Sequence, residues 1–292
     1  MIPGSRIPFD RQSTEDTSSI FILLPATGKR IDLNPSRRME MDSFLNHLGQ
    51  PVGFPVDNWQ APDPPSRAPL LGRYCRIEPL DTGRHAVDLF FAYGLDSEGR
   101  LWTYLPYGPF ETLKDFSLWM EEVSKPSDPL YFAIMDSATG KATGIAAFLR
   151  IDPKNGSIEV GCLCFSPLLQ RTAIATEAMF LMMEYAFSLG FRRYEWKCNA
   201  LNTPSRAAAE RLGFTFEGVF RQATVVKGHN RDTAWYSILD CEWPDLRVKF
   251  LKWLDPENFD SFGQQKNRLN LRRNSPESDS NIDRIDRQEE KA

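Results

Sequence analysis

The sequence predicts an α+β domain with a mixed, mostly antiparallel central sheet flanked by helices. Strand-like segments follow one another through the middle of the chain, and Asn155-Gly156 between two of them is a strong hairpin signal. Two further strands each run into a helix through a short turn. Antiparallel hairpins with helices packed against them are typical of α+β folds.

Two periodicities locate the elements. Alternating or short continuous apolar runs indicate strands, and apolar residues three or four apart indicate helices. In chain order the expected strands are residues 73–79, 130–135, 143–151, 157–165, 193–198, 214–220 and 233–239. The expected helices are residues 82–95, 110–123, 175–190 and 205–212.

Composition divides the chain into four parts. The expected parts are a disordered extension at 1–44, a proline-rich arm at 45–70, the folded domain at 71–245 and a largely disordered tail at 246–292. Phe54 and Trp59 indicate that the arm lies on the domain surface, since a bare linker would not usually carry such aromatic residues. Within the tail, residues 250–254 are expected to add only a short amphipathic piece.

The overall composition is that of an ordinary soluble globular protein. Of the 292 residues 41% are hydrophobic and 25% charged, and the formal net charge is −4. This charge argues against a general nucleic-acid-binding surface, so no nucleic-acid partner is expected. No apolar run is long enough to span a bilayer, so no membrane partner is expected. The expected compartment is the cytoplasm, with the nucleus as the alternative.

The five cysteines predict neither disulfides nor a metal site. Their number is odd, and their spacing is not that of a disulfide framework. Cys162 and Cys164 lie two apart in a strand and therefore on one face, but the three histidines are widely scattered and give no further metal ligands. Small buried thiols are expected, and no metal cofactor.

The stretch from Phe165 to Met179 joins an apolar strand to a helix through a turn of mostly small and polar residues. A helix start exposes unpaired backbone N–H groups and carries a partial positive charge, so it can hold an anion such as a pyrophosphate. The residues of the turn and helix start are Gln170, Arg171, Thr172, Ala173, Ile174, Ala175 and Thr176. They predict an anion site made by backbone N–H groups.

A second strand, loop and helix lie downstream, with Asn202-Thr-Pro-Ser205 before the helix and Gly213 at its end. Asn and Ser are favoured at helix starts, so a capping role explains Asn202 and Ser205 adequately.

Together the two units resemble the acetyl-CoA-binding core of the GNAT N-acetyltransferases, in particular the RimJ/RimL-like branch. The series from Asn202-x-x-Ser205 to Arg211-Leu-Gly-Phe-x-x-Glu-Gly218 makes this resemblance specific at the level of the fold, over roughly residues 45–245. The resemblance implies acetyl-CoA as co-substrate. The implied cofactor contacts are Phe165, Gln170, Arg171, Thr172, Ala173, Ala175, Thr176 and Asn202.

The resemblance also implies two catalytic residues. Ser205 would lie near the thioester sulfur and stabilise the departing thiolate by a hydrogen bond, because a hydroxyl is a weak acid. Glu159 lies on the strand that leads into the first turn, where a carboxylate often acts as a base through water in this superfamily. The alternative for Glu159 is an exposed strand residue paired with an arginine or lysine.

The chain departs from the family pattern at three positions. Arg171 and Ala173 replace the usual glycines of the turn, and glycine matters where the backbone needs a positive φ or a close ligand approach. Alanine costs little at a negative φ, and the Arg171 guanidinium can itself face a phosphate, so we read the turn as functional. The contrary reading is a degenerate site. Thr224 stands where RimL-like enzymes can carry a proposed catalytic glutamate.

Four residues are candidates for binding the acceptor. Trp102, Tyr104 and Tyr107 lie in a segment that resembles the branch between the early helices, where the acceptor pocket is expected. They would wall it because aromatic faces suit amines, although ordinary packing explains them as well. Asp232 matches another motif of the branch and could orient the substrate. Alternatively, it is a turn carboxylate satisfied by backbone or by Arg231.

The leading hypothesis is an acetyl-CoA-dependent N-acetyltransferase acting on a primary amine of a small molecule or a protein N-terminus. Direct attack within a ternary complex is expected, since no cysteine and histidine form a convincing nucleophile–base pair. The alternative, prompted by the missing glycines and Thr224, is a non-catalytic acyl-CoA-binding regulatory module. The fold gives neither the acceptor nor the oligomeric state.

Overall fold

The computed structural model describes residues 44–261 and 263–271, so nearly all of the expected N-terminal extension and the distal tail lie outside the described residues. Contacts divide the chain into two units. In the unit of Met1–Asn58 with Arg273–Ala292, the described part forms a short hairpin of β1 (Phe44–Leu45) and β2 (Pro51–Val52). The other unit, Trp59–Arg272, contains the remaining elements.

The larger unit is built on a sheet of eight strands in the order β3-β4-β5-β6-β7-β8-β10-β9. The strands are β3 (Leu70–Leu71), β4 (Cys75–Pro79), β5 (Leu130–Asp136), β6 (Ala142–Asp152), β7 (Ser157–Phe165), β8 (Arg193–Asn199), β9 (Thr215–Val226) and β10 (His229–Leu239). In this sheet β7 and β8 pair in parallel and the other neighbours are antiparallel. The predicted fold class, a mixed and mostly antiparallel sheet, is confirmed.

Polar side chains cap the starts of helices α1 to α4. The helices are α1 (Thr82–Gly94), η1 (Arg100–Trp102), α2 (Leu113–Val123), α3 (Ala173–Ser188), α4 (Thr203–Arg211), α5 (Trp243–Trp253) and η2 (Pro256–Asn258). Asp81, Thr112, Thr172 and Asn202 accept hydrogen bonds from backbone N–H groups in the first turns of α1, α2, α3 and α4. The cap at Thr112 starts α2 later than the sequence pattern predicts.

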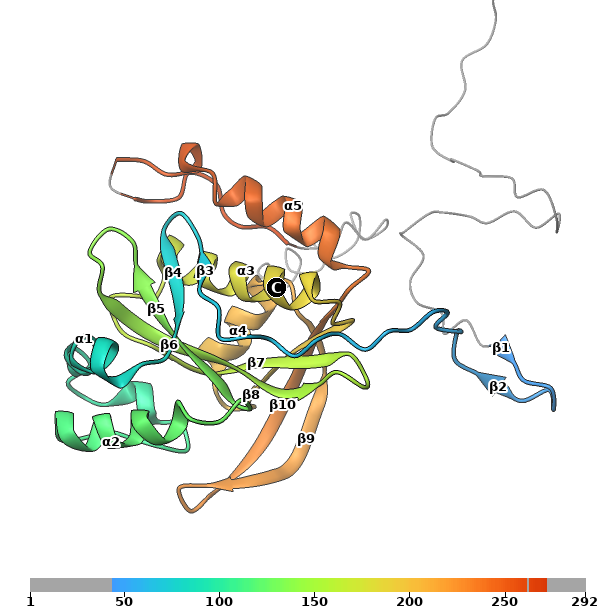
Figure 1. The fold of residues 1–292 in the computed structure, drawn as a ribbon, viewed down its shortest axis with the longest axis horizontal. Coiled ribbons are helices and arrows are strands. Elements are labelled where there is room, and N and C mark those ends of the chain that lie inside the picture. The colour runs from blue at the N-terminus through green and yellow to red at the C-terminus, as the bar shows by residue number, and fades with distance from the viewer. Residues whose placement is uncertain (1–43, 262, 272–292) are drawn as a thin grey trace, which may run out of the picture. The chain divides into compact units, whose positions relative to one another are not determined.

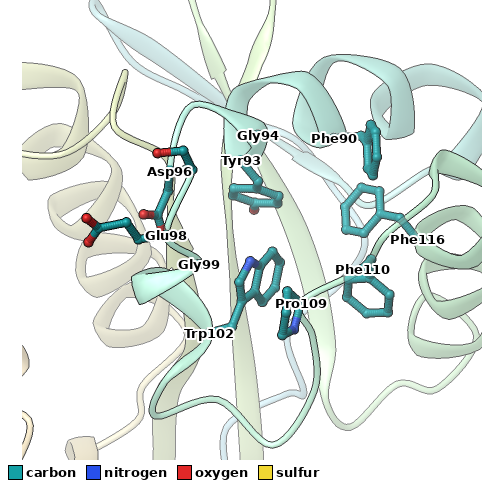
Figure 2. A pocket seen from close by; sticks show the side chains of 11 residues that line it. Phe90, Tyr93, Gly94, Asp96, Glu98, Gly99, Trp102, Pro109, Phe110 and Phe116 are labelled. Carbon is teal, nitrogen blue, oxygen red and sulfur yellow. The ribbon is translucent and has the colours of Figure 1, made fainter.

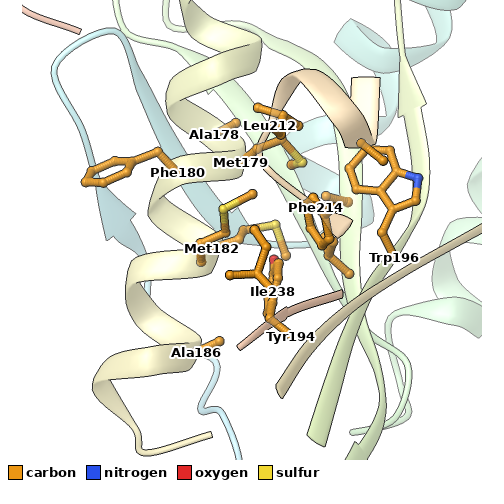
Figure 3. Packing of buried hydrophobic residues seen from close by; sticks show 14 of the residues in the cluster. Ala178, Met179, Phe180, Met182, Ala186, Tyr194, Trp196, Leu212, Phe214 and Ile238 are labelled. Carbon is orange, nitrogen blue, oxygen red and sulfur yellow. The ribbon is translucent and has the colours of Figure 1, made fainter. Parts of the chain in front are cut away.

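The two faces of the sheet bury different helices (Figure 1). On one face α1 and α2 pack against β5 and β6 through Leu89, Phe116 and Met120. On the other face α3 places Met179 and Met182 against side chains of β8, β10 and the segment after α4, as Figure 3 shows. The face of β8, β9 and β10 on the α1 side contributes nothing to either buried apolar cluster.

An extra residue in β7 reverses its side-chain alternation. Ala147 pairs with Gly161, but Ile145 pairs with Cys164, so β7 is one residue longer than β6 between these pairs. Cys162 sits in this bulge at φ 50°. Ile158 and Val160 therefore face α3, whereas Cys162 and Cys164 both face α1, on one side as predicted.

The hairpin of β9 and β10 is longer than the sequence pattern predicts. Lys227 and Gly228 at its tip have φ of 49° and 78°, as a type I′ turn requires of both central residues. Residues 221–225 are exposed, so they lack the alternation that reveals a half-buried strand.

The predicted domain end at residue 245 is too early. Helix α5 passes through it, and Trp243, Leu246, Phe250 and Trp253 are buried on one face at helical spacing. The rings of Trp243 and Phe250 pack against Phe180 on α3, at centroid distances of 5.9 and 5.6 Å. After α5 the Trp253 indole N–H donates to the Asn267 carbonyl at 3.0 Å, and Leu271 is buried. The predicted tail is therefore folded as far as residue 271.

Part of the proline-rich arm is held on the larger unit. The Trp59 indole N–H donates to the Lys154 carbonyl at 3.3 Å, and the Ser66 backbone N–H donates to the Tyr185 hydroxyl at 2.9 Å. The Arg67 guanidinium donates to the Pro126 carbonyl at 2.6 Å. These contacts agree with the expectation that the arm lies on the domain surface from Trp59 onward.

Phe250→Ala should lower the free energy of unfolding by about 3–5 kcal/mol, because it leaves a cavity between α5 and α3. Urea unfolding followed by circular dichroism measures the change. Val248→Ala on the same helix is the control, since Val248 is 64% exposed and should change stability by less than about 0.5 kcal/mol. Equal effects of the two substitutions would contradict the assignment of α5 to the core.

Candidate active site

Parallel pairing of β7 and β8 runs from Ser157 opposite Arg193 to Val160 opposite Trp196, and no further pair joins the two strands. The space between β7 beyond Val160 and β8 beyond Trp196 is called the strand gap below. Helix α3 follows β7 and α4 follows β8. Because the two strands are parallel, the starts of α3 and α4 both lie toward the end of the sheet where the strand gap opens.

The start of α3 presents unpaired backbone donors. Thr172 caps the helix by accepting from the Ala175 N–H at 3.1 Å. Within the described part of the chain, no residue accepts a hydrogen bond from the backbone N–H of Arg171, Thr172, Ala173 or Ile174. These donors and the positive end of the helix dipole form a site suited to an anion.

Arg171 has the backbone conformation that the family's glycine would supply. Its φ is 62°, in the left-handed region that costs an L-residue about 1–2 kcal/mol. The side chain is exposed, and no described residue hydrogen-bonds or ion-pairs with its guanidinium. The missing glycine therefore leaves the shape of the turn intact and adds a free cation beside the anion site.

The other predicted cofactor residues hold the turn and the helix start together. The Gln170 amide donates to the Phe165 carbonyl at 2.8 Å, across the turn. The Arg211 guanidinium of α4 donates to the Thr176 hydroxyl at 3.2 Å and so joins the two helices. Ala173 is the first residue of α3.

Glu177 has a structural role that the sequence pattern did not reveal. Its carboxylate accepts from the backbone N–H groups of Arg73, Tyr74 and Cys75 at 2.9, 2.6 and 2.8 Å. A Cβ on Gly72 would lie 2.5 Å from this carboxylate, so glycine is required there by close approach. The N-terminal half of α3 is therefore fixed to the turn between β3 and β4.

The start of α4 combines a cap with a positioned hydroxyl. Asn202 accepts from the Ser205 N–H at 3.2 Å, which confirms the capping interpretation of this pair. The Ser205 hydroxyl oxygen accepts from the Trp196 indole N–H at 3.1 Å, so its own proton stays available to an acceptor. Burial raises the pKa of the Cys198 thiol, and a hydrogen bond from Ser205 opposes that rise.

Glu159 lies on the other face of the sheet, inside a network of charges that we call the charged cluster. Its members are Arg150, Glu159, Arg193, Glu195, Lys197 and Glu217. Glu159 Oε2 contacts Arg150 Nη1 at 2.6 Å and Lys197 Nζ at 2.9 Å. Burial raises the pKa of Glu159, although both cations oppose the rise. The predicted pairing with Arg or Lys is present, but the residue is buried rather than exposed.

Neither cationic contact uses Glu159 Oε1. A Cβ built on Gly161 would lie 3.4 Å from this oxygen, so Oε1 faces the point where the strand gap begins. Lys197 Nζ also contacts Glu195 Oε2 at 2.7 Å and lies 3.7 Å from the Trp235 ring centroid. Lys197 was not recognised from the sequence. The sequence signal for Lys197 is its place on a strand between two residues that face the other side of the sheet, Trp196 and Cys198.

The predicted acceptor aromatics lie between α1 and α2. Trp102 is buried against Tyr93, Tyr107 and Phe110, and lines a cavity of about 270 Å³ with an acidic rim of Asp96 and Glu98 (Figure 2). The buried Tyr107 hydroxyl has no hydrogen-bond partner among the described residues.

This aromatic segment is fixed at two points. The Tyr104 hydroxyl donates to the Leu201 carbonyl at 3.2 Å, just before α4. Lys227 Nζ, at the tip of the β9–β10 hairpin, donates to the Trp102 carbonyl at 2.8 Å. Residues from three parts of the chain therefore meet at this aromatic segment.

Asp232 is turned toward its own hairpin. Its Oδ1 accepts from the Gln222 N–H at 2.7 Å and from the Asn230 amide at 3.0 Å. Gln222 has a φ of 49°, so the carboxylate secures a bulged position of β9. These bonds lower the pKa of Asp232, and the bond from the Gln222 N–H has the largest effect. They match the alternative interpretation of Asp232 as a carboxylate satisfied by backbone, whereas Arg231 is not its partner.

Among the described residues, no group of three or more His, Cys, Asp or Glu side chains is arranged to hold a metal ion, and no helix could span a membrane. Thr224 lies on the exposed part of β9, opposite Arg231.

Comparison with known proteins agrees with this geometry. A family model described as an acetyltransferase (GNAT) domain matches residues 76–215. The crystal structure of a GCN5-related N-acetyltransferase from Brucella melitensis has 51% sequence identity and a TM-score of 0.72, covering 73% of this chain and 97% of that one. This chain belongs to the GNAT acetyltransferase family.

The GNAT assignment makes the protein an N-acetyltransferase, and enzymes of this family use acetyl-CoA. The uncharacterized N-acetyltransferase p20 of Bacillus licheniformis is 27% identical over 159 residues, which cover 54% of this chain and 89% of that protein. The ribosomal-protein-serine acetyltransferase of Escherichia coli is 31% identical over 100 residues, 34% of this chain and 56% of that enzyme. The second match agrees with the predicted RimJ/RimL-like branch.

Arg171→Gly in this GNAT enzyme should raise the free energy of unfolding by up to about 1 kcal/mol, because glycine relieves the left-handed strain but gains entropy when unfolded. It should weaken acetyl-CoA binding about tenfold by removing a cation from the anion site. Thermal unfolding and calorimetric titration measure the two effects. Arg171→Lys keeps the charge and is the control. Unchanged affinity in the glycine variant would show that the guanidinium does not contact the coenzyme.

Proposed function

We propose that this chain transfers the acetyl group of acetyl-CoA directly to a primary amine, in a complex that holds both substrates. The observation that carries the proposal is the set of unpaired N–H groups at the start of α3, beside the strand gap that leads to Ser205. A phosphate-bearing thioester needs both features, an anion site for its phosphates and a donor for its sulfur.

Acetyl-CoA would lie along the strand gap. Its pyrophosphate would accept hydrogen bonds from the N–H groups of residues 171–174, and the Arg171 guanidinium would add a positive charge. Its pantetheine arm would extend past Phe165 and Asn202. An extended chain in this gap can use the backbone groups that β7 and β8 no longer give to each other.

Ser205 is proposed to stabilise the leaving thiolate. The hydroxyl oxygen is already engaged by the Trp196 N–H, so the hydroxyl proton can be donated. When the amine attacks the carbonyl carbon, the tetrahedral intermediate collapses and the C–S bond breaks. The electron pair then goes to sulfur, where the Ser205 O–H can bind it.

Glu159 is proposed as the general base, acting through water. Arg150 and Lys197 hold one carboxylate oxygen, and the second faces Gly161 at the start of the strand gap. Burial raises the pKa of Glu159 and brings it closer to the neutral range in which a base is effective.

The acceptor is proposed to enter from the side of α1 and α2. Trp102, Tyr104 and Tyr107 would form its wall, and Asp232 would keep the adjacent hairpin in place. The E. coli relative is named for acetylating a ribosomal protein at serine. A peptide amine and a small-molecule amine are therefore both candidate acceptors.

Ser205→Ala should lower kcat about tenfold to a hundredfold, by removing one donor to the leaving group, with little change in acetyl-CoA affinity. The assay is thiol release from acetyl-CoA with a broad panel of amines, and mass spectrometry identifies the products. Coenzyme binding without amine-dependent thiol release for any acceptor would instead support the non-catalytic acyl-CoA-binding module.

Glu159→Gln should lower kcat/KM about a hundredfold and flatten the acidic limb of the pH–rate profile. Because the base must be deprotonated to act, the wild-type rate should rise as the pH rises through the raised pKa of Glu159. Glu184→Gln is the control carboxylate, distant in the chain and paired with Arg247 on the helical side. An unchanged acidic limb in the Glu159 variant would exclude Glu159 as the base.

A further inference from the structure

Arg231 on β10 is a cation without a partner. Its Nε is buried, and no described residue hydrogen-bonds or ion-pairs with its guanidinium. The neighbouring carboxylate, Asp232, is directed to Gln222 and Asn230 instead. An unpaired buried donor is costly, so a retained one points to a ligand that would satisfy it.

Arg231 lies beside the last residues of β8, because Thr233 pairs with Asn199 and the Ala200 N–H donates to the Asp232 carbonyl at 2.9 Å. Its charge acts on the thiol of Cys162 in β7 and on the thiol of Cys198 in β8, in each case favouring the thiolate. Both residues lie just past the last pair that joins the two strands.

The carboxylates of the charged cluster are already paired with cations. Glu159 is shared by Arg150 and Lys197, and Glu195 by Arg193 and Lys197. Glu217 forms an ion pair with Arg193 at 2.5 Å and accepts a hydrogen bond from the Ser237 hydroxyl at 2.6 Å. Each of these acids has its own donors, and none is paired with Arg231. Arg231 therefore leaves positive charge uncompensated on the acceptor side of the strand gap.

We propose that Arg231 binds a carboxylate of the acceptor, and that the acceptor is an amine bearing an acidic group close to the reacting nitrogen. A planar guanidinium matches a carboxylate in a bidentate pair. The unpaired cation would also disfavour a bound ammonium and so help to keep the nucleophile neutral. This inference rests on the proposed function, and it narrows the acceptor to amino acids or to peptides with an acidic residue near the N-terminus.

The test compares matched acceptors that differ only in this charge. Thiol release from acetyl-CoA by the full-length protein is measured with free L-amino acids and their amides. A second arm uses peptides whose second residue is Asp or Asn, so that an α-carboxylate and a side-chain carboxylate are distinguished. We expect kcat/KM to favour the acidic member of one arm by about tenfold or more.

Arg231→Gln should remove this preference by raising KM for the acidic acceptor at least about tenfold, while the amide or Asn acceptor changes little. Arg231→Lys should restore part of it. Arg221→Gln is the matched control, because it removes the same charge from an exposed position of the same hairpin. Thermal unfolding verifies that each variant is folded.

The remaining outcomes overturn the inference. Equal or better turnover of the uncharged acceptors shows that no carboxylate is recognised. An equal loss of kcat for charged and uncharged acceptors in the Gln variant assigns Arg231 to the leaving group instead. Absence of amine-dependent thiol release from the whole panel is different, because it rejects the proposed function itself and the inference with it.

Discussion

The end of pairing between β7 and β8 is the constraint on which the rest of the site depends. A parallel pair that continued past Val160 and Trp196 would satisfy its own backbone groups and leave none for a ligand. The bulge at Cys162 interrupts the strand just beyond that point and reverses the side-chain alternation. Each strand then runs into a turn and a helix, so two capped helix starts lie at one end of the sheet.

The sheet separates two kinds of electrostatics. On the helical side the charge is carried by backbone dipoles, with Thr172 and Asn202 organising the first turns of α3 and α4. On the opposite side it is carried by ionised side chains, where Lys197 lies between Glu159 and Glu195. Isolated buried charges would be very costly, so each carboxylate of the cluster is held by cations or hydroxyls. Backbone dipoles can hold a phosphate group, whereas a balanced network can hold a titratable base in place without fixing it as permanently charged.

Much of the scaffold could be predicted from the sequence, because local signals there agree with the fold. The Asn155-Gly156 turn and the bounds of β7 are examples. Helix α5 was missed because Trp243, Leu246, Phe250 and Trp253 are spaced among charged residues, and only the fold shows that α3 needs a cover. The role of Glu177 could not be predicted, because its three acceptor bonds reach residues far away in the chain. The sequence indicates Arg231 only as a partner for Asp232, since a missing partner is visible only in three dimensions.

The two tethers of the aromatic segment have a consequence for how this enzyme can diversify. Both the Tyr104 and the Lys227 bonds end on main-chain carbonyls, those of Leu201 and Trp102. A carbonyl is present whatever side chain its residue carries. The exposed side chain of Leu201 can therefore be exchanged during evolution or in a mutant library while the Tyr104 bond is kept, whereas the indole of Trp102 is also held by its packing against Tyr93 and Phe110. The position of the aromatic segment against α4 is thus independent of the side chain at residue 201.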